Sequence, residues 1–540
     1  MASVELVMAA IGTADLCLKY GKKLVDAYRV YKAADENVKS KILMIEAIWH
    51  KTATQIEFVK RVASVLQEEH CRIHFEVFEM LQGKLMTAIS KIEGVLKKND
   101  PEKAPGVGLR RWKFVLIRES LDEIICELER WQRIFDPTWL LILRVGDEGI
   151  DTELSRDTVS PSLSRSSTLV PSSNDSTMST ARNLRGMIKS DSSRDDIHVS
   201  LPEDGLDWAN ATVIQYSNIK ILERPRSGKI FAIDSIACGP GVDVSRARAD
   251  AETLAKKLRL VDPKSCNLLS CHGLIKRKSP QSRQLASIDL VFRLPLPSLN
   301  NGQGEPTKLF SLRQQLLHIH PSTISLTHVL NIALHLARAV SSVHTCEFVH
   351  KNIRPETILV LPDETNPLIQ LGSAHLLGFD SFRGVYFHTN RLGDPAWERN
   401  LYRHPQRQGL HANDAYIMQH DLYSLGVCLL ELGLWTSFLE YPDGDGQVIP
   451  SNALGLALKD FEYTEKSGAN IKEHLVRVAK SKLPARMGDR YTAVVVTCLT
   501  CLDPGNEDFG DPEYMRDEDG ILIGVRFIEK VLVQLGNISF

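Results

Sequence analysis

The sequence predicts a multidomain protein with an N-terminal all-α helical bundle and a C-terminal α+β domain. Two changes in composition along the 540 residues support this division. Residues 1–145 carry apolar residues at helical spacing, whereas short β-type runs begin near residue 205. The residues between them, 146–204, are rich in Ser and Thr. We therefore expect a bundle, a flexible linker and a second globular domain, in that order.

The N-terminal region has the periodicity of long amphipathic helices. Two stripes of mainly apolar residues recur at intervals of three and four: Ile42, Ile45, Trp49, Thr52 and Ile56, then Cys71, Phe75, Phe78, Leu81 and Leu85. Such a stripe forms the buried face of a helix. Pro101 and Pro105 interrupt the pattern and predict a break between helices. The pattern as a whole predicts a bundle of about four to six helices.

The linker prediction rests on low apolar content. The segments 160–168 and 172–177 consist mainly of Ser and other polar residues. Such a segment buries too little apolar surface to offset the entropy cost of ordering it. Two interpretations stay open: a solvated tether, or a region regulated by phosphorylation, which would add negative charge.

The C-terminal region changes from a strand pattern to a helix pattern. The strand candidates are residues 211–222, 229–236, 268–274 and 288–294, and a helix is expected at about 244–260. Further along, one helical stripe comprises Leu330, Ala333, Leu336, Ala337, Val340 and Val343. This order predicts an α+β domain with a strand-rich lobe over about 205–297 and a helical lobe over about 298–540.

Composition excludes several classes of protein. A net charge of −2 gives no reason to expect nucleic-acid binding. The ten cysteines are scattered, which favours a reducing, cytoplasmic setting, and Cys498 and Cys501 lie in an apolar run where core packing is expected rather than a metal or redox site. The N-terminus lacks a basic leader, and no apolar run reaches the roughly 18–20 residues of a membrane span.

The segment 350–357 carries the most specific signal in the chain. It resembles the catalytic loop His-Arg-Asp-Leu-x-x-x-Asn of eukaryotic protein kinases. Residues 368–374 resemble the strand that enters the kinase Asp-Phe-Gly motif, residues 402–406 resemble the segment ending in Ala-Pro-Glu, and 420–431 resemble the buried helix that carries Asp-x-x-Ser-x-Gly. Four motifs in this order imply a bilobal protein kinase-like fold over residues 205–540.

The resemblance separates supporting residues from reactive ones. It implies that Asp421 accepts hydrogen bonds from the loop backbone, with His350 packed beneath it, and both residues are kept. Asn352 replaces the catalytic Asp, and Thr357 replaces an Asn that binds magnesium. An amide cannot act as a general base, and such a loss typically lowers the rate by about 10²–10⁴.

Other kinase positions are also altered. Gln370 takes the place of the magnesium-binding Asp, with Gly372 kept after it. Asp234 falls where a phosphate-binding Lys belongs, with Lys229 as a nearby alternative. Glu252 either matches the Glu that pairs with this Lys or lies on a solvated helix face. No Gly-x-Gly-x-x-Gly loop precedes these residues.

We therefore expect a pseudokinase with no catalytic residues and no metal site. No cofactor follows from the sequence. The resemblance leaves open that ATP binds without magnesium-dependent catalysis.

The N-terminal region resembles fungal HeLo and HeLo-like domains, and in architecture the four-helix domain of mixed lineage kinase domain-like proteins. Residues 9–16 are similar to the first helix of HeLo domains, which is rich in small residues. Residues 491–503 and 527–532 resemble the last helices of fungal HeLo-associated kinase-like proteins. This resemblance implies a helical effector domain under the control of a pseudokinase, in fungal cell death or non-self recognition.

Several expectations about partners and function follow. We expect a protein partner or self-association through the bundle, and no nucleic acid. Val4, Val7, Met8 and Ile11 share a face of the first helix, so residues 1–20 either contact a membrane surface on activation or pack into the bundle core. Two alternative functions stay open: an atypical active kinase with residual ATP binding, and a non-catalytic scaffold.

Overall fold

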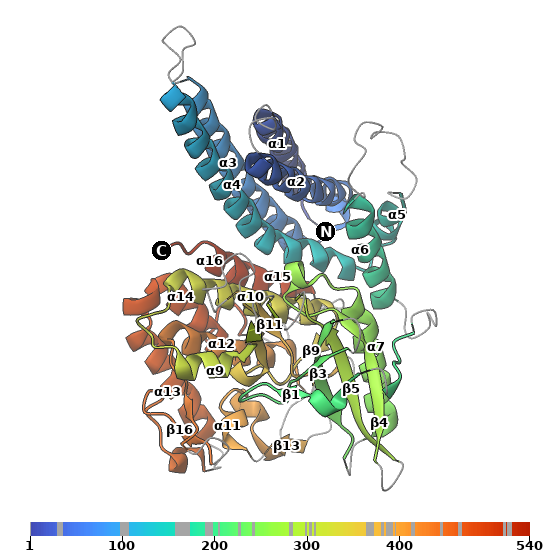
Figure 1. Cartoon of the computed structure of the whole chain (residues 1–540), viewed down its shortest axis with the longest axis vertical. Helices are drawn as coiled ribbons and strands as arrows, with labels where there is room; N and C mark the ends of the chain where they lie inside the picture. Colours follow the sequence, from blue (N-terminus) through green and yellow to red (C-terminus); the bar gives the residue numbers. More distant parts are fainter. Residues whose placement is uncertain are drawn as a thin grey trace. The chain divides into compact units, whose positions relative to one another are not determined.

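The computed structural model (Figure 1) describes most of the chain. The described residues are 2–29, 36–97, 107–156, 173–189, 198–203, 206–224, 228–239, 243–279, 284–296, 300–301, 305–306, 309–362, 372–379, 383–384, 392–394, 396–411, 416–442, 447–462, 467–510, 515 and 521–540. Two compact units result: Met1–Gly186 with Glu518–Val525, called the helical unit below, and Met187–Asp517 with Arg526–Phe540, called the α+β unit.

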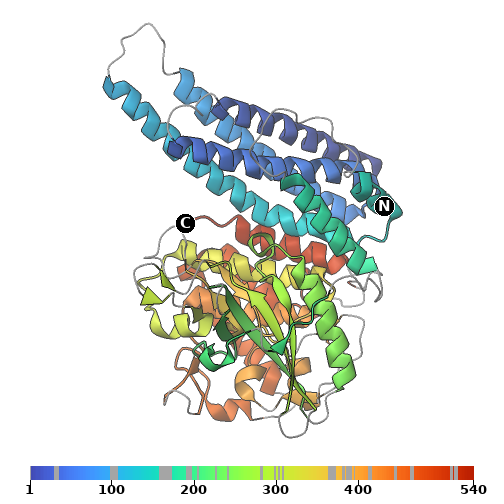
Figure 2. The same cartoon turned by 45° about the vertical axis from the view of Figure 1, so that its right-hand side comes forward.

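Among its described residues, the N-terminal part of the helical unit contains four long α-helices and two shorter ones. Their bounds are α1 Val4–Arg29, α2 Glu36–Val62, α3 Glu68–Lys97, α4 Val107–Leu141, α5 Glu148–Arg156 and α6 Ser173–Lys189. Figure 2 shows the four long helices lying lengthwise along one another. The predicted all-α N-terminal region is therefore confirmed.

The predicted stripes form the core of this unit. On α2, Ile42, Ile45, Trp49, Thr52 and Ile56 are all buried; on α3, Cys71, Phe78, Leu81 and Leu85 are buried and Phe75 is half-buried. A polar layer joins α2 to α4, where Asp136 accepts hydrogen bonds from Lys51 Nζ at 2.9 Å and Gln55 Nε2 at 3.1 Å. Because this buried carboxylate is paired, its place in the core is tolerated.

The structure differs from the prediction of a flexible linker over 146–204. Helices α5 and α6 both lie in this range, and the Ser-rich residues 157–172 between them are outside the described part. The two helices have few large apolar residues, and Ile150, Leu154, Met178, Ala181 and Leu184 are buried. Because the range 146–204 as a whole is rich in Ser and Thr, its average composition did not indicate these two amphipathic helices.

Arg185 fastens α6 within the helical unit. Its side chain is 2% exposed, and it donates to the carbonyl oxygens of Leu143, Val145 and Asp147 at 2.7–3.0 Å. It also bonds to both carboxylate oxygens of Asp151 on α5, at 2.6 and 3.0 Å. A guanidinium with five donors in a fixed plane suits such a set of acceptors.

Replacing Arg185 with Ala should release α6. The substitution leaves three backbone carbonyls and one carboxylate without their donor, a loss of about 2–4 kcal/mol. Hydrogen–deuterium exchange in residues 178–189 should then accelerate. The control is Arg156→Ala on α5, whose side chain is 68% exposed and pairs with Glu153. Unchanged exchange in α6 of Arg185→Ala would contradict this role.

The α+β unit begins with a five-stranded antiparallel sheet in the order β1-β2-β3-β5-β4. Its strands are β1 Thr212–Val213, β2 Lys220–Glu223, β3 Ile230–Ala237, β4 Cys271–Lys278 and β5 Leu285–Arg293, with α7 Val244–Arg259 between β3 and β4. One strand was expected at 211–222. It is divided in two because Tyr216 takes a left-handed backbone conformation, with φ +57°.

The rest of this unit is mainly helical. Its helices are α8 Pro263–Cys266, α9 Leu312–His318, α10 Leu326–Thr345, α11 Trp397–Asn400, α12 Met418–Leu434, α13 Ser467–Lys482, α14 Pro484–Leu499 and α16 Val533–Gly536. Helix α15 Ile521–Phe527 lies mainly in the helical unit, which includes its residues up to Val525. Short strands are β6 Asn300–Asn301, β7 Glu305–Pro306, β8 Phe310–Ser311, β9 Phe348–Val349, β10 Ile358–Val360, β11 Ala374–Leu376, β12 Arg383–Gly384, β13 Leu392–Asp394, β14 Gly409–His411, β15 Leu439–Glu440 and β16 Ile449–Pro450. The predicted α+β class is confirmed.

Helix α12 forms the centre of the helical part. Every residue from Met418 to Gly433 is buried. Its Gly426 packs so closely on α14 that an added Cβ would lie 2.9 Å from the Cβ of Cys498. Cys498 and Cys501 are both fully buried, as expected for core residues. Within the described part of the chain, no helix is long and apolar enough to cross a membrane.

Candidate functional site

Asp421 anchors the loop that carries the sequence signal. It lies in the first turn of α12 and is fully buried. Its Oδ2 accepts the backbone N–H of His350 at 2.7 Å, and its Oδ1 accepts that of Lys351 at 2.9 Å. The Tyr416 hydroxyl donates to Oδ1 at 2.7 Å, and His344 Nε2 lies 3.0 Å from Oδ2. The loop backbone is thereby fixed to α12.

These hydrogen bonds keep the carboxylate ionised. Burial by itself would raise the pKa of Asp421, but the hydrogen bonds from the His344 side chain and the His350 backbone lower it below its ordinary value. His350 is buried beside Phe379, with 4.8 Å between ring centroids. Burial lowers the pKa of His350 to about 4, so this ring is neutral at pH 7. A neutral His350 ring beside an ionised Asp421 carboxylate indicates that this pair supports the loop structurally.

Asn352 and Thr357 direct their polar groups into the protein. Asn352 Nδ2 donates to the carbonyl oxygen of Gly378 at 3.2 Å, and its Oδ1 accepts from Arg354 Nε at 2.8 Å. Thr357 Oγ1 lies 2.9 Å from the carbonyl oxygens of both Asn352 and Arg354. Both side chains are buried, at 7% and 4% exposure. They hold the loop closed on itself and on Gly378.

Asp234 reaches the same turn from the five-stranded sheet. It lies on β3 and is 5% exposed. Its Oδ2 accepts the backbone N–H of Gly378 at 2.8 Å and that of Phe379 at 2.6 Å. Gly378 has φ +86°, and an added Cβ would lie 2.3 Å from Thr357 Cγ2, so only glycine fits there. Asp234, Asn352 and Thr357 therefore converge on one turn.

The predicted counterpart of the Asp-Phe-Gly motif, Gln370 to Gly372, falls at the edge of the described residues. Gln370 lies outside the described residues. Gly372 donates its N–H to the Leu361 carbonyl at 2.9 Å and precedes β11. The turn that follows this strand is at Gly378–Phe379.

The two remaining candidates lie away from this turn. Lys229 is exposed and precedes β3. Glu252 on α7 accepts from Lys276 Nζ of β4 at 2.8 Å and from Arg248 Nε at 3.0 Å. The charge of Glu252 is therefore used to hold α7 against the sheet.

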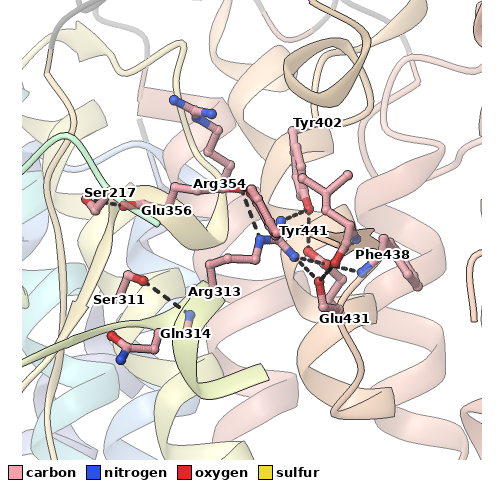
Figure 3. Close-up of polar contacts among 12 residues, drawn as sticks. Ser217, Ser311, Arg313, Gln314, Arg354, Glu356, Tyr402, Glu431, Phe438 and Tyr441 are labelled. Carbon is pink, nitrogen blue, oxygen red and sulfur yellow. Dashed lines mark hydrogen bonds and ion pairs between the residues drawn. The ribbon is translucent and has the colours of Figure 1, made fainter. Parts of the chain in front are cut away.

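A buried cluster around Arg313 was not foreseen from the sequence. Arg313 belongs to α9 and is fully buried (Figure 3). Its Nε donates to Glu356 Oε1 at 3.0 Å and its Nη1 to Glu431 Oε1 at 2.6 Å. Tyr402 contacts both Arg313 and Glu431, and Tyr441 donates to Glu356 at 3.1 Å. The only signal was Glu431 itself, an acid within an apolar run.

The Arg313 cluster keeps charged side chains in the protein interior. Burial would lower the pKa of Arg313, but Glu356 and Glu431 raise it well above its ordinary value, so the guanidinium stays charged. The two acids respond differently: the pKa of Glu356 is lowered, mainly by Arg313 against the effect of burial, whereas burial raises that of Glu431. The cluster joins α9, the loop, Tyr402 and α12, which are remote in sequence.

Removing Arg313 should destabilise the α+β unit strongly. Arg313→Ala leaves two buried carboxylates, Glu356 and Glu431, without the guanidinium that pairs with both, and breaking such a cluster costs about 3–5 kcal/mol. Thermal unfolding of the full chain should show a lowered midpoint for this unit. Arg248→Ala, at a side chain 56% exposed, should change stability by less than about 1 kcal/mol. Equal stability of the two variants would contradict a central role for the cluster.

Comparison with known proteins gives no assignment. No protein-family model matches the chain, and no curated protein matches its sequence. A function must therefore be inferred from the motifs and from the geometry of the described residues.

Proposed function

We propose that the chain is a catalytically silent signalling protein, in which a protein kinase-like domain controls the N-terminal helical unit. Asp234 is the observation that carries the proposal. An active kinase places a Lys on its third strand to bind the phosphates of ATP. In this chain the corresponding residue of the run 231–234 is an acid, and its carboxylate already accepts two backbone N–H groups.

Charge argues against ATP at this position. The carboxylate of Asp234 would repel phosphate groups, and burial in a low-dielectric environment strengthens the repulsion. From the pairing of β11 with β10, we propose that Gly378, which has no side chain, takes the position of the magnesium-binding Asp in place of Gln370. The Asp234 carboxylate, which contacts this turn from β3, already accepts two backbone N–H groups.

The substituted loop residues serve the same structural purpose. Asn352 donates to a carbonyl oxygen and Thr357 bonds within the loop, so neither is oriented for proton transfer. Asp421 keeps the loop in place regardless of catalysis. The residues that support the loop are kept, whereas the residues that would carry out phosphoryl transfer are replaced. This combination favours a domain that acts through its shape and its binding contacts, and we propose that it signals by binding.

The first helix supports a contact role for the helical unit. Val4 is 79% exposed and Met8 is 63% exposed, whereas Ala10, Ala14 and Cys17 are buried. Val7 and Ile11 are half-buried. The start of α1 thus presents apolar side chains outward while its middle packs inward. We propose that residues 1–20 supply the contact with a membrane surface during activation.

A phosphoryl-transfer assay tests the silent domain. The full chain should transfer no phosphate from ATP to itself or to a protein substrate, with Mg²⁺ or with Mn²⁺. Asn352→Asp should not create activity, because Asp234 and Gly378 remain. Reproducible transfer that Asn352→Ala abolishes, but that the exposed-site control Arg248→Ala keeps, would show an atypical active kinase.

Vesicle binding tests the effector role. The full chain should sediment with anionic phospholipid vesicles, and Val4→Asp combined with Met8→Asp should weaken binding at least about tenfold, since each buried apolar side chain contributes about 1.5–3 kcal/mol. The control is Leu458→Asp, at a residue 40% exposed in the α+β unit. Absence of binding together with stable protein partners would favour the scaffold alternative.

A further inference from the structure

Two histidines lie one helical turn apart in the core of the helical unit. His70 and His74 of α3 are 0% and 1% exposed, and their rings stack with 5.0 Å between centroids. His74 also packs on Phe78 and Phe135, at 6.0 and 6.2 Å. Two titratable rings therefore share an aromatic environment.

These rings have very few polar contacts. His70 Nε2 lies 3.4 Å from the Thr138 carbonyl oxygen. Among the described residues, His70 Nδ1 and both ring nitrogens of His74 have no hydrogen-bond partner. Buried polar atoms without partners are uncommon in native proteins and call for an explanation. Neutral rings minimise the cost of such a site, whereas a charged ring would need a compensating anion.

The described charged groups nearby do not provide that anion. Asp136 of α4 is held by Lys51 and Gln55 of α2 and by Gln132, which donates at 2.6 Å. From α1, the Cys17 thiol donates to the Phe78 carbonyl, and burial raises the pKa values of Cys17 to about 12 and of Cys71 to about 11, so both are neutral. A proton on His70 would repel a proton on His74 and so lowers the pKa of His74 further.

Helix α3 is joined to its neighbours close to these rings. Cys17 Sγ of α1 bonds to the Phe78 carbonyl at 3.2 Å, and Trp131 Nε1 of α4 donates to the Val77 carbonyl at 2.8 Å. A charge placed at residue 74 would act one turn from both contacts. Loosening there would separate α3 from both α1 and α4.

We propose that the His70–His74 pair is an acid-sensitive latch, whose protonation loosens α3 from α1 and α4 at mildly acidic pH. This proposal does not rest on the kinase-like domain or on membrane binding. It assigns a response to pH to two residues that the proposed function does not use.

The direction of the pH effect follows from burial. Burial lowers the pKa of His70 to about 4 and that of His74 well below its ordinary 6.5. The open state therefore binds more protons, so stability is complete above pH 6.5 and is lost as the pH falls toward 4. Protonation of Asp136 would affect stability only at lower pH, since its pKa is below 3.8 in the folded state. Between pH 7 and pH 5, protonation of His70 should raise the opening equilibrium constant roughly 20-fold, and His74 acts in the same direction.

Hydrogen–deuterium exchange on the full chain tests the latch. After correction for the intrinsic exchange rate, residues 68–81 should lose protection between pH 7.0 and pH 5.2. The double variant His70→Phe, His74→Phe should keep its protection at pH 5.2. The control is His50→Gln, at an exposed residue of α2, which should behave as the unmodified chain. Full protection of the unmodified chain at pH 5.2 would overturn the proposal, as would equal loss in the double variant.

A second measurement avoids dependence on the folding of the variant. Exchange of the imidazole C2 hydrogens, followed by mass spectrometry on the unmodified chain, reports on each histidine separately. His70 and His74 should exchange far more slowly than His50 at pH 7, and should approach its rate below pH 5.2 as α3 opens. Equal rates for the three residues at pH 7 would show that the pair is accessible and would overturn the latch.

Discussion

The buried carboxylate of Asp421 fixes the loop from His350 to Thr357, and the surrounding contacts depend on that position. Two backbone N–H groups, one hydroxyl and one imidazole compensate its burial, so that an ionised acid persists in the core. Once the loop is fixed, Asn352 can reach the carbonyl of Gly378. The same loop position places the Glu356 carboxylate within hydrogen-bond distance of Arg313 Nε. A single anchored acid thus organises two clusters on opposite ends of one short loop.

Asp234 completes the arrangement from the sheet side. Its carboxylate binds the turn at Gly378–Phe379, so the sheet and the helical part of the α+β unit meet through an acid and two amides. A phosphate-binding site would need positive charge in the same place. The polar groups around this turn are engaged with one another, which is the physical basis for proposing a domain that signals without catalysis.

Helix periodicity and strand patterns could be predicted from sequence because they depend on neighbouring residues. The stripes on α2 and α10 and the bounds of β3 and α7 were predictable in this way. The turn at Gly378 and the Arg313 cluster were not, because they depend on strand pairing and on residues more than forty positions apart. The helices within 146–204 were missed because a few buried side chains and Arg185, rather than composition, stabilise them.

ATP affinity of the full chain, measured by calorimetry with and without Mg²⁺, tests the central claim most directly. The isosteric variant Asp234→Asn removes one negative charge while keeping an oxygen that accepts from Gly378 and Phe379. If Asp234 opposes the phosphates, this variant binds ATP more tightly than the unmodified chain, whose affinity does not increase with Mg²⁺. Tighter binding of magnesium–ATP by the unmodified chain than by Asp234→Asn would contradict the account.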